Sequence, residues 1–237
     1  MKFSDGRSRS WEGSKQSHRW PHGLSLLGRV LRIHLIFLIL QVCCGLASAA
    51  DIDNDWPMFR GEPCRTGFSP SPVPVKPRIR WTYNVGSPVS VSPAVVASTV
   101  FVGCEGGDFF AIDMKTGQRR WKFSGKEPVQ CSPAVFNNRV FYGDHGGVFR
   151  ALDVADGRLA WSFEAGGKII SPPLIVNNYV IYGSYDNMLY CLDAESGALR
   201  WQFETDGPVH CGPCLAGQEV VIAGCDGNLR FISLKDG

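Results

Sequence analysis

The stretch "ALDVADGRLAW", residues 151–161, decides the fold, because close copies of it stand 40 residues away on either side. They read "AIDMKTGQRRW" at 111–121 and "CLDAESGALRW" at 191–201. Three residue types keep the same period of 40: Trp81, Trp121, Trp161 and Trp201; Gly117, Gly157, Gly197 and Gly237; Pro93, Pro133, Pro173 and Pro213. Chance does not give several registers with one period, so the chain is an internal repeat.

Each repeat contains the pattern of four short strands. Three consecutive apolar residues, 100–102 in the first repeat, are followed by a glycine or alanine and predict a strand buried on both faces. Equivalent patterns predict a strand around Val95, a strand ending at Ile112 and a strand beginning at each tryptophan. Turn-forming letters such as "DHGG" and "VADG" separate them.

Four short antiparallel strands per 40 residues predict an all-β fold, a β-propeller with four-stranded blades. We expect a signal peptide at 1–49, a lead-in at 50–80 and four repeats. The repeats occupy 81–120, 121–160, 161–200 and 201–237, and the last one is incomplete.

The three quoted stretches resemble the tryptophan-docking motif of the pyrroloquinoline-quinone-like propellers, Ala-x-Asp-x-x-Thr-Gly-x-x-x-Trp. This family includes the quinoprotein dehydrogenases and the outer-membrane-protein assembly lipoprotein of Gram-negative bacteria. "DWPMFRG", residues 55–61, is similar to the start of mature bacterial members. The resemblance covers about 55–237 and implies a ring of seven or eight blades. We therefore expect the four repeats to belong to a longer protein. The alternatives are two copies that combine into one ring, or a chain that closes alone.

The N-terminal residues predict export. A basic region ends at Arg32, an apolar run occupies 35–46, and "ASA" at 47–49 matches a signal-peptidase site, so cleavage is expected after Ala49. The apolar run is shorter than the about 17–25 residues of a spanning helix; an uncleaved anchor is the alternative. Seven of the 24 Lys and Arg and two of the 22 Asp and Glu lie in 1–49, so the rest carries a net charge of −3. That charge argues against nucleic-acid binding.

"CGPC", residues 211–214, has the spacing of a thioredoxin-type redox centre. Pro213, however, is the proline of the repeat, and Cys214 occupies a position where other repeats carry Ala94, Ala134 and Leu174. A redox pair usually obtains its low thiol pKa at a helix N-terminus, and no helix is expected here. We interpret the two cysteines as inert thiols.

The dehydrogenase branch of the family uses pyrroloquinoline quinone, calcium, a catalytic aspartate and often a vicinal disulfide. The adjacent cysteines of this chain, Cys43 and Cys44, fall in the predicted signal peptide, and no acidic calcium-binding set is evident. Asp113, Asp153 and Asp193 are interpreted as turn caps. We therefore expect no catalytic, cofactor-binding or metal-binding residues, and no cofactor.

Recognition is expected at the turns, because four equivalent positions differ in every repeat: Glu105, His145, Tyr185 and Cys225. His145 and His210 are interpreted as solvent-facing side chains. Arg150 and Arg230 either line a rim for an acidic ligand or are solvated surface residues.

The sequence therefore predicts an exported, non-catalytic propeller in the periplasm or outside the cell, a scaffold for a protein or small-ligand partner. The alternative is part of a pyrroloquinoline-quinone-dependent dehydrogenase with bound calcium.

Overall fold

The structure is a computed structural model that describes residues 55–237. The predicted signal peptide, its cleavage site after Ala49 and the Cys43-Cys44 pair lie outside the described residues. The described part is all-β and contains no helix long and apolar enough to cross a membrane.

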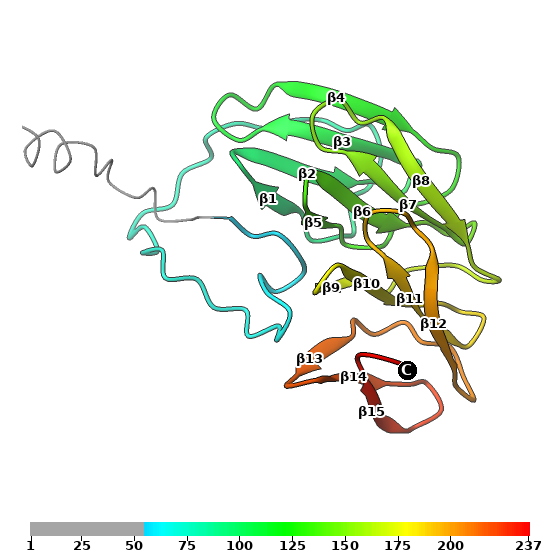
Figure 1. The fold of residues 1–237 in the computed structure, drawn as a ribbon. Coiled ribbons are helices and arrows are strands. Elements are labelled where there is room, and N and C mark those ends of the chain that lie inside the picture. Colours follow the sequence, from blue (N-terminus) through cyan, green and yellow to red (C-terminus); the bar gives the residue numbers. More distant parts are fainter. Residues whose placement is uncertain (1–54) are drawn as a thin grey trace, which may run out of the picture. The chain divides into compact units, whose positions relative to one another are not determined.

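Within residues 55–237, fifteen strands form four antiparallel sheets (Figure 1). Inside each sheet, strands that follow one another along the chain are paired. The first sheet contains β1 (Ala94–Val96), β2 (Thr99–Gly103), β3 (Asp108–Asp113) and β4 (Arg119–Ser124). The second contains β5 (Ala134–Phe136), β6 (Arg139–Gly143), β7 (Val148–Asp153) and β8 (Leu159–Glu164). The third contains β9 (Leu174–Val176), β10 (Tyr179–Gly183), β11 (Met188–Asp193) and β12 (Leu199–Glu204). The fourth contains β13 (Cys214–Ala216), β14 (Glu219–Ala223) and β15 (Leu229–Ser233).

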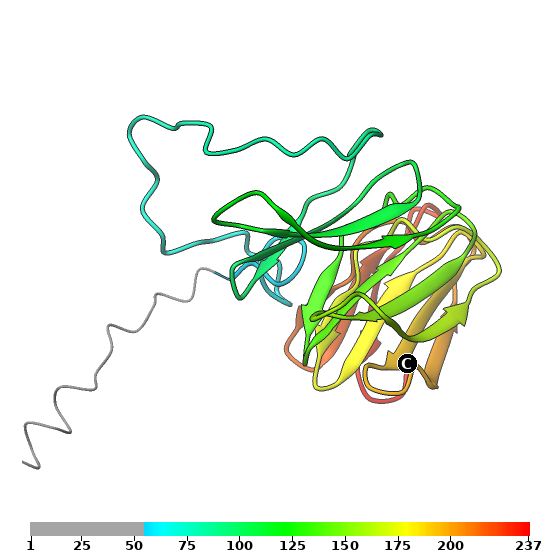
Figure 2. The ribbon, with the colours of Figure 1, turned by 90° about the horizontal axis from the view of Figure 1, so that it is seen from above.

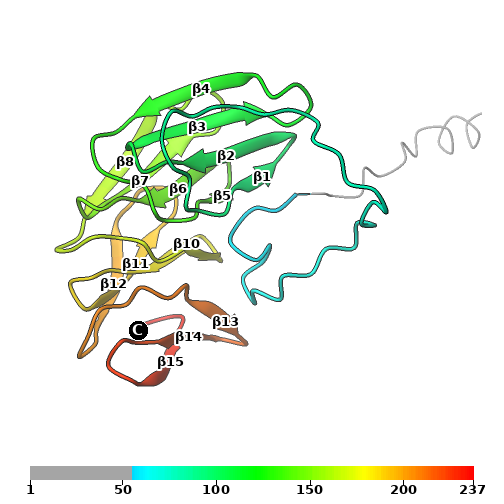
Figure 3. The same cartoon turned by 180° about the vertical axis from the view of Figure 1, so that it is seen from behind.

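These sheets confirm the predicted β-propeller blades, and Figure 3 shows them succeeding one another in chain order. One boundary differs from the prediction. The outer strand of each complete blade begins two residues before its tryptophan, at Arg119, Leu159 and Leu199. The register between the third and outer strands shifts there: Ala111 pairs with Trp121 and Ile112 with Arg119, so Arg120 is the extra residue of a β-bulge.

The first hairpin of each blade turns through two residues. Asn137 and Asn138 have φ of 44° and 59°, and Asn177 and Asn178 have φ of 48° and 65°. Positive φ at both positions is typical of a type I′ turn, whose twist matches the flanking strands.

Each tryptophan joins its blade to the next one. The Nε1–H groups of Trp121 and Trp161 donate to the carbonyl oxygens of Val154 and Ala194, at 2.8 and 3.2 Å. The Trp121 ring lies so close to Gly157 that a Cβ there would stand 2.6 Å from it. The repeated glycine is therefore required by contact with the tryptophan as well as by its φ of 74°.

The core lies between blades rather than within them. Phe109 of β3 stacks on Tyr142 of β6 with ring centroids 4.2 Å apart. The next pair repeats this contact, with Phe149 of β7 on Tyr182 of β10 at 4.0 Å. All four side chains are buried, so each blade covers the apolar face of its neighbour.

The first part of the lead-in, residues 55–65, runs along the innermost strands, which Figures 1 and 3 both show. Trp56 forms a bridge with Val95 of β1, and the amides of Val135 in β5 and Leu215 in β13 donate to the carbonyls of Pro57 and Pro63. Amides at the inner edge of three blades are thereby satisfied by one segment. Figure 2 shows that the chain then leaves the sheets in a long loop before it enters the first blade.

Arg65 anchors this segment. Its side chain is 8% exposed and donates to the carbonyl oxygens of Phe59, Pro172 and Pro213, from both the lead-in and the two later blades. Burial lowers the pKa of Arg65 to about 10, which still leaves the guanidinium charged near neutral pH.

Candidate functional site

The four predicted recognition turns have the same backbone arrangement. Each turn joins the second and third strands of its blade, and its amide donates to the loop that leads into that blade. These bonds run from Glu105 to Pro88, from His145 to Pro128, from Tyr185 to Lys168 and from Cys225 to Pro208. Equivalent backbones therefore present four different side chains in one row.

The first half of this row is a chain of hydrogen bonds. Gln130, in the loop between β4 and β5, donates from Nε2 to Glu105 Oε1 at 3.0 Å. His145 Nε2 lies 2.8 Å from Gln130 Oε1, so Nε2 carries the proton in this arrangement. Gln130 thus connects the turns of the first and second blades.

The second half is aromatic and cationic. Lys168 Nζ lies 4.1 Å from the centre of the Tyr185 ring, a cation–π contact. The Tyr185 and His210 rings are 6.1 Å apart, and His210 Nδ1 lies 3.0 Å from Cys225 Sγ. His210 connects the turns of the third and fourth blades, as Gln130 connects the first two. We call these seven residues the variable row: Glu105, Gln130, His145, Lys168, Tyr185, His210 and Cys225.

The sequence analysis placed four members of the variable row at the recognition turns, interpreted His210 as solvent-facing, and missed Gln130 and Lys168. Gln130 stands two periods before His210, so the repeat spacing could have identified it. The interpretation of the histidines as solvent-facing is wrong for His145, which is half-buried. His210 is exposed, but it has a side-chain partner.

The two candidate rim arginines are neither free nor simply solvated. Arg150 forms an ion pair with the buried Asp144, and Arg230 forms one with Asp226 at 2.6 Å. Their side chains are 17% and 18% exposed. Both arginines therefore hold their own blade's turn in place.

The repeated aspartates cap their own turns, as their spacing predicts. Asp193 Oδ1 accepts hydrogen bonds from the amides of Glu195 and Ser196, while Oδ2 accepts one from Arg200 at 2.7 Å. These bonds, that from Arg200 foremost, lower the pKa of Asp193 to about 2. Asp113 has the corresponding bonds to its own turn and to Arg120, and its pKa is lowered as well.

The "CGPC" segment leads into β13, which begins at Cys214, and no helix begins there. Cys211 and Cys214 are half-buried, free thiols, and the Cys211 Sγ donates to the carbonyl oxygen of Ala223. Burial raises the pKa of Cys131 and of Cys191 to about 12, so these two thiols are poor nucleophiles at neutral pH.

No group of three or more His, Cys, Asp or Glu residues that could hold a metal ion occurs within 55–237.

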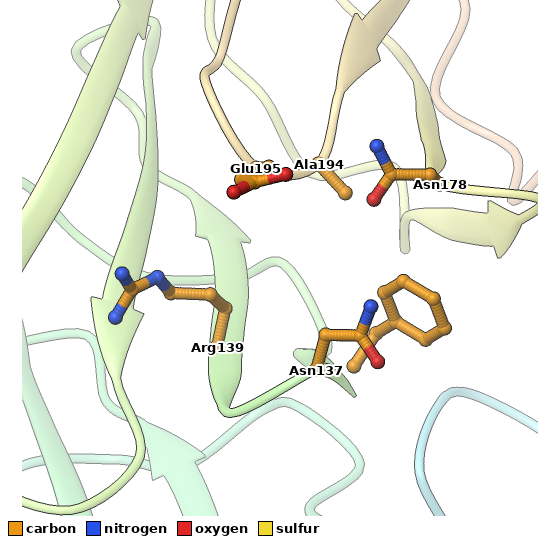
Figure 4. Close-up of a pocket in the computed structure, with 6 residues that line it drawn as sticks. Asn137, Arg139, Asn178, Ala194 and Glu195 are labelled. Carbon is orange, nitrogen blue, oxygen red and sulfur yellow. The ribbon is translucent and has the colours of Figure 1, made fainter.

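A pocket of about 260 Å³ lies on the opposite set of turns, where the second and third blades meet (Figure 4). Asn137, Arg139, Asn178 and Glu195 surround it, with Phe136 and Ala194 completing its wall. Arg139 and Asn178 are already bound to Asp153 and Asp193. The pocket is small and polar, and two of its polar side chains already have hydrogen-bond partners within the chain.

Comparison with known proteins places the fold. No curated protein matches the chain. Among solved structures, BamB from Moraxella catarrhalis is 20% identical over 65% of this chain and 49% of its own, with a TM-score of 0.60. The computationally designed Ika4 protein is 20% identical over 64% of this chain and 94% of its own, with a TM-score of 0.57.

The quinohemoprotein alcohol dehydrogenase ADHIIG from Pseudomonas putida HK5 is 15% identical over 78% of this chain and 39% of its own, with a TM-score of 0.64. The chain thus spans about half the length of the BamB structure and less of the dehydrogenase. These likenesses show a shared propeller fold.

The family model described as outer membrane protein assembly factor BamB matches residues 76–171 and 164–237, which together include every strand of the structure. With its repeated tryptophans docked blade to blade, this chain belongs to the family of outer membrane protein assembly factor BamB.

Proposed function

We propose that this chain is an exported, non-catalytic propeller that binds a protein partner in the cell envelope through the variable row. The observation that carries the proposal is the contrast between backbone and side chains. Four turns repeat one hydrogen-bonding pattern, yet they present an acid, an imidazole, a phenol and a thiol. A rigid scaffold with variable turns is the arrangement that binding proteins use for recognition.

The side chains of the variable row are better suited to binding a protein partner than to catalysis. Glu105 and Lys168 supply opposite charges, and Tyr185 and His210 supply aromatic surface. Interfaces are enriched in such aromatic anchors, with polar groups at their rim. The family description, an assembly factor for outer membrane proteins, and the predicted signal peptide support an envelope location in a bacterium with an outer membrane.

A photo-crosslinking amino acid at single positions tests this proposal in the native host. We expect an analogue at His145 or Tyr185 to form covalent adducts with one envelope protein, identified by mass spectrometry. An analogue at Asp156, on the opposite set of turns, is the matched control and should give none. Equal adducts at all three positions, or none at any, would contradict recognition by the variable row.

The second candidate is part of a quinone-dependent dehydrogenase, which the fold likeness to ADHIIG supports. Within 55–237, no group of three or more His, Cys, Asp or Glu residues that could hold a metal ion occurs, so any calcium site there would also draw on carbonyl or amide oxygens. Equilibrium dialysis of the chain with pyrroloquinoline quinone, with and without calcium, separates the candidates. Calcium-dependent retention of the quinone would favour the dehydrogenase.

A further inference from the structure

Two cysteines that are far apart in the sequence lie close together where the lead-in passes β13 (Figures 1 and 3). Cys64 belongs to the lead-in, and Cys214 is the first residue of β13. The amide of Leu215 donates to the carbonyl oxygen of Pro63 at 3.0 Å. One hydrogen bond thus joins the residue after Cys214 to the residue before Cys64.

This hydrogen bond limits the distance between the two cysteines. Trans-peptide geometry places the Cα of Cys64 about 2.8 Å from the Pro63 oxygen and the Cα of Cys214 about 2.4 Å from the Leu215 nitrogen. Both Cα atoms stand to the side of the N–H···O line, which puts them roughly 4.5–7 Å apart. Disulfides have Cα separations of about 4.4–6.8 Å, so the backbone already holds the two cysteines at the spacing that a disulfide needs.

A second contact holds the same pair from its other side. Arg65, which follows Cys64, donates from Nε to the carbonyl oxygen of Pro213, which precedes Cys214. The Arg65 guanidinium is buried and donates to two further carbonyl oxygens, so its position is fixed. Crosswise contacts on both sides of a residue pair are typical of antiparallel neighbours, although here a side chain replaces one backbone amide. Both flanks of each cysteine are therefore tied to the flanks of the other.

We propose that Cys64 and Cys214 are the two halves of a disulfide, which forms in an oxidising environment and ties the lead-in to the fourth blade. Both are free thiols in the structure, and neither is enclosed, because Cys64 is exposed and Cys214 is half-buried. A soluble disulfide can therefore reach Cys64 first. The inference concerns the scaffold, so it does not depend on binding by the variable row.

The bond forms by thiol–disulfide exchange, with a small disulfide as the oxidant. The Cys64 thiolate attacks one sulfur of the oxidant, forms a mixed disulfide and releases the first thiolate. The Cys214 thiolate then attacks the Cys64 sulfur and displaces the second thiolate. The two cysteines lose two protons and two electrons in total, and the oxidant leaves as two thiols.

The other cysteines within 55–237 are less suitable partners. Three of them are buried: Cys104, Cys131 and Cys191. The thiol of Cys211 donates to the carbonyl oxygen of Ala223 in its own blade, and that of Cys225 lies 3.0 Å from His210 Nδ1. The described chain thus offers Cys64 one partner whose backbone is bonded to its own.

The disulfide would have a large effect on unfolding. Cys64 precedes β1 and Cys214 begins β13, so the bond closes a loop that contains the first three blades. Closing a long loop removes much of the conformational entropy of the unfolded chain. We expect the oxidised chain to unfold at least about 5 °C above the reduced chain.

Oxidation of the purified chain tests the proposal. The reduced chain is incubated with oxidised glutathione under native conditions, its remaining thiols are alkylated, and a digest is mapped by mass spectrometry without reduction. We expect one linked pair of peptides, containing Cys64 and Cys214. Cys211→Ser, at the neighbouring cysteine, is the matched control and should form the same link, whereas Cys214→Ser should form none.

Thermal unfolding gives the second measurement. The oxidised parent chain should lose its higher midpoint when a reductant is added, and Cys64→Ser should have one midpoint under both conditions. Alkylation of both Cys64 and Cys214 after oxidation would overturn the proposal. So would a link from either residue to another cysteine. Because the purified chain is used, these outcomes concern the cysteine pair and are separate from the proposed export.

Discussion

At the level of single residues, the blade-to-blade contact requires a glycine for two separable reasons. Gly157 has a φ of 74° and the Trp121 ring against it, whereas Gly217 has a φ of 64° and open space around it. We expect Gly217→Ala to cost about 1–2 kcal/mol, the penalty of the left-handed conformation. Gly157→Ala should cost about 1–3 kcal/mol more, because the added methyl also displaces the indole ring. Urea unfolding of both variants measures the difference, and equal losses would show that the tryptophan contact does not constrain the glycine.

A second residue-level prediction concerns a buried hydroxyl. Tyr182 is fully buried and its ring stacks on Phe149, but its OH group has no hydrogen-bond partner among residues 55–237. Tyr182→Phe keeps the stacked ring and removes the desolvated hydroxyl, so we expect a gain of about 1–3 kcal/mol in unfolding free energy. The same urea titration measures it. A loss of stability would mean that the hydroxyl is hydrogen-bonded in solution.

The turn aspartates predict a specific dependence of stability on pH. The folded pKa of Asp193, about 2, lies below its usual value near 3.8, so the charged form stabilises the fold. That contribution is complete above the unfolded pKa and is lost as pH falls from about 4 to about 2. Thermal unfolding of Asp193→Asn should therefore show a flatter pH profile in this window than the parent chain. Parallel profiles would exclude Asp193 as a contributor.

At the level of elements, the lead-in depends on Arg65 to stay against the inner strands. Removing the guanidinium in Arg65→Ala leaves three carbonyl oxygens without their donor, which we expect to cost about 2–4 kcal/mol. The amide of Leu215, which donates to Pro63, should then exchange much faster, while the amide of Val140 inside β6 should change little. Hydrogen exchange by mass spectrometry measures both. Equal acceleration at the two positions would indicate general destabilisation instead of a released lead-in.

The elements also show how far the sequence determines the fold and the site. The period of 40 predicts the position of every strand to within about two residues, because each blade buries the same pattern of apolar residues against its neighbours. The path of the lead-in was not predictable, since residues 55–65 occur once and their carbonyls pair with distant strands. The recognition turns were predictable as a set from their equivalent spacing. Lys168 was not, because the cation–π contact that brings it into the variable row has no counterpart in the other blades.

At the level of the whole molecule, the blades are coupled because every large core cluster is shared by two of them. One cluster joins the first and second blades, one the second and third, and one the third and fourth. Stability in such an array is a sum of blade terms and nearest-neighbour terms, so no blade is independent of those beside it.

Phe149→Ala tests this coupling. The substitution removes a buried ring between the second and third blades and should cost about 3–5 kcal/mol. If unfolding is cooperative through the shared clusters, amides in β2 of the first blade and β14 of the fourth should lose protection by a similar amount as those in β6 and β10. Leu199→Ala, at an exposed leucine, is the control and should leave all four strands unchanged. Loss of protection restricted to β6 and β10 would show instead that the blades open separately. The first and fourth blades would then stay folded although the contact between the second and third blades is weakened.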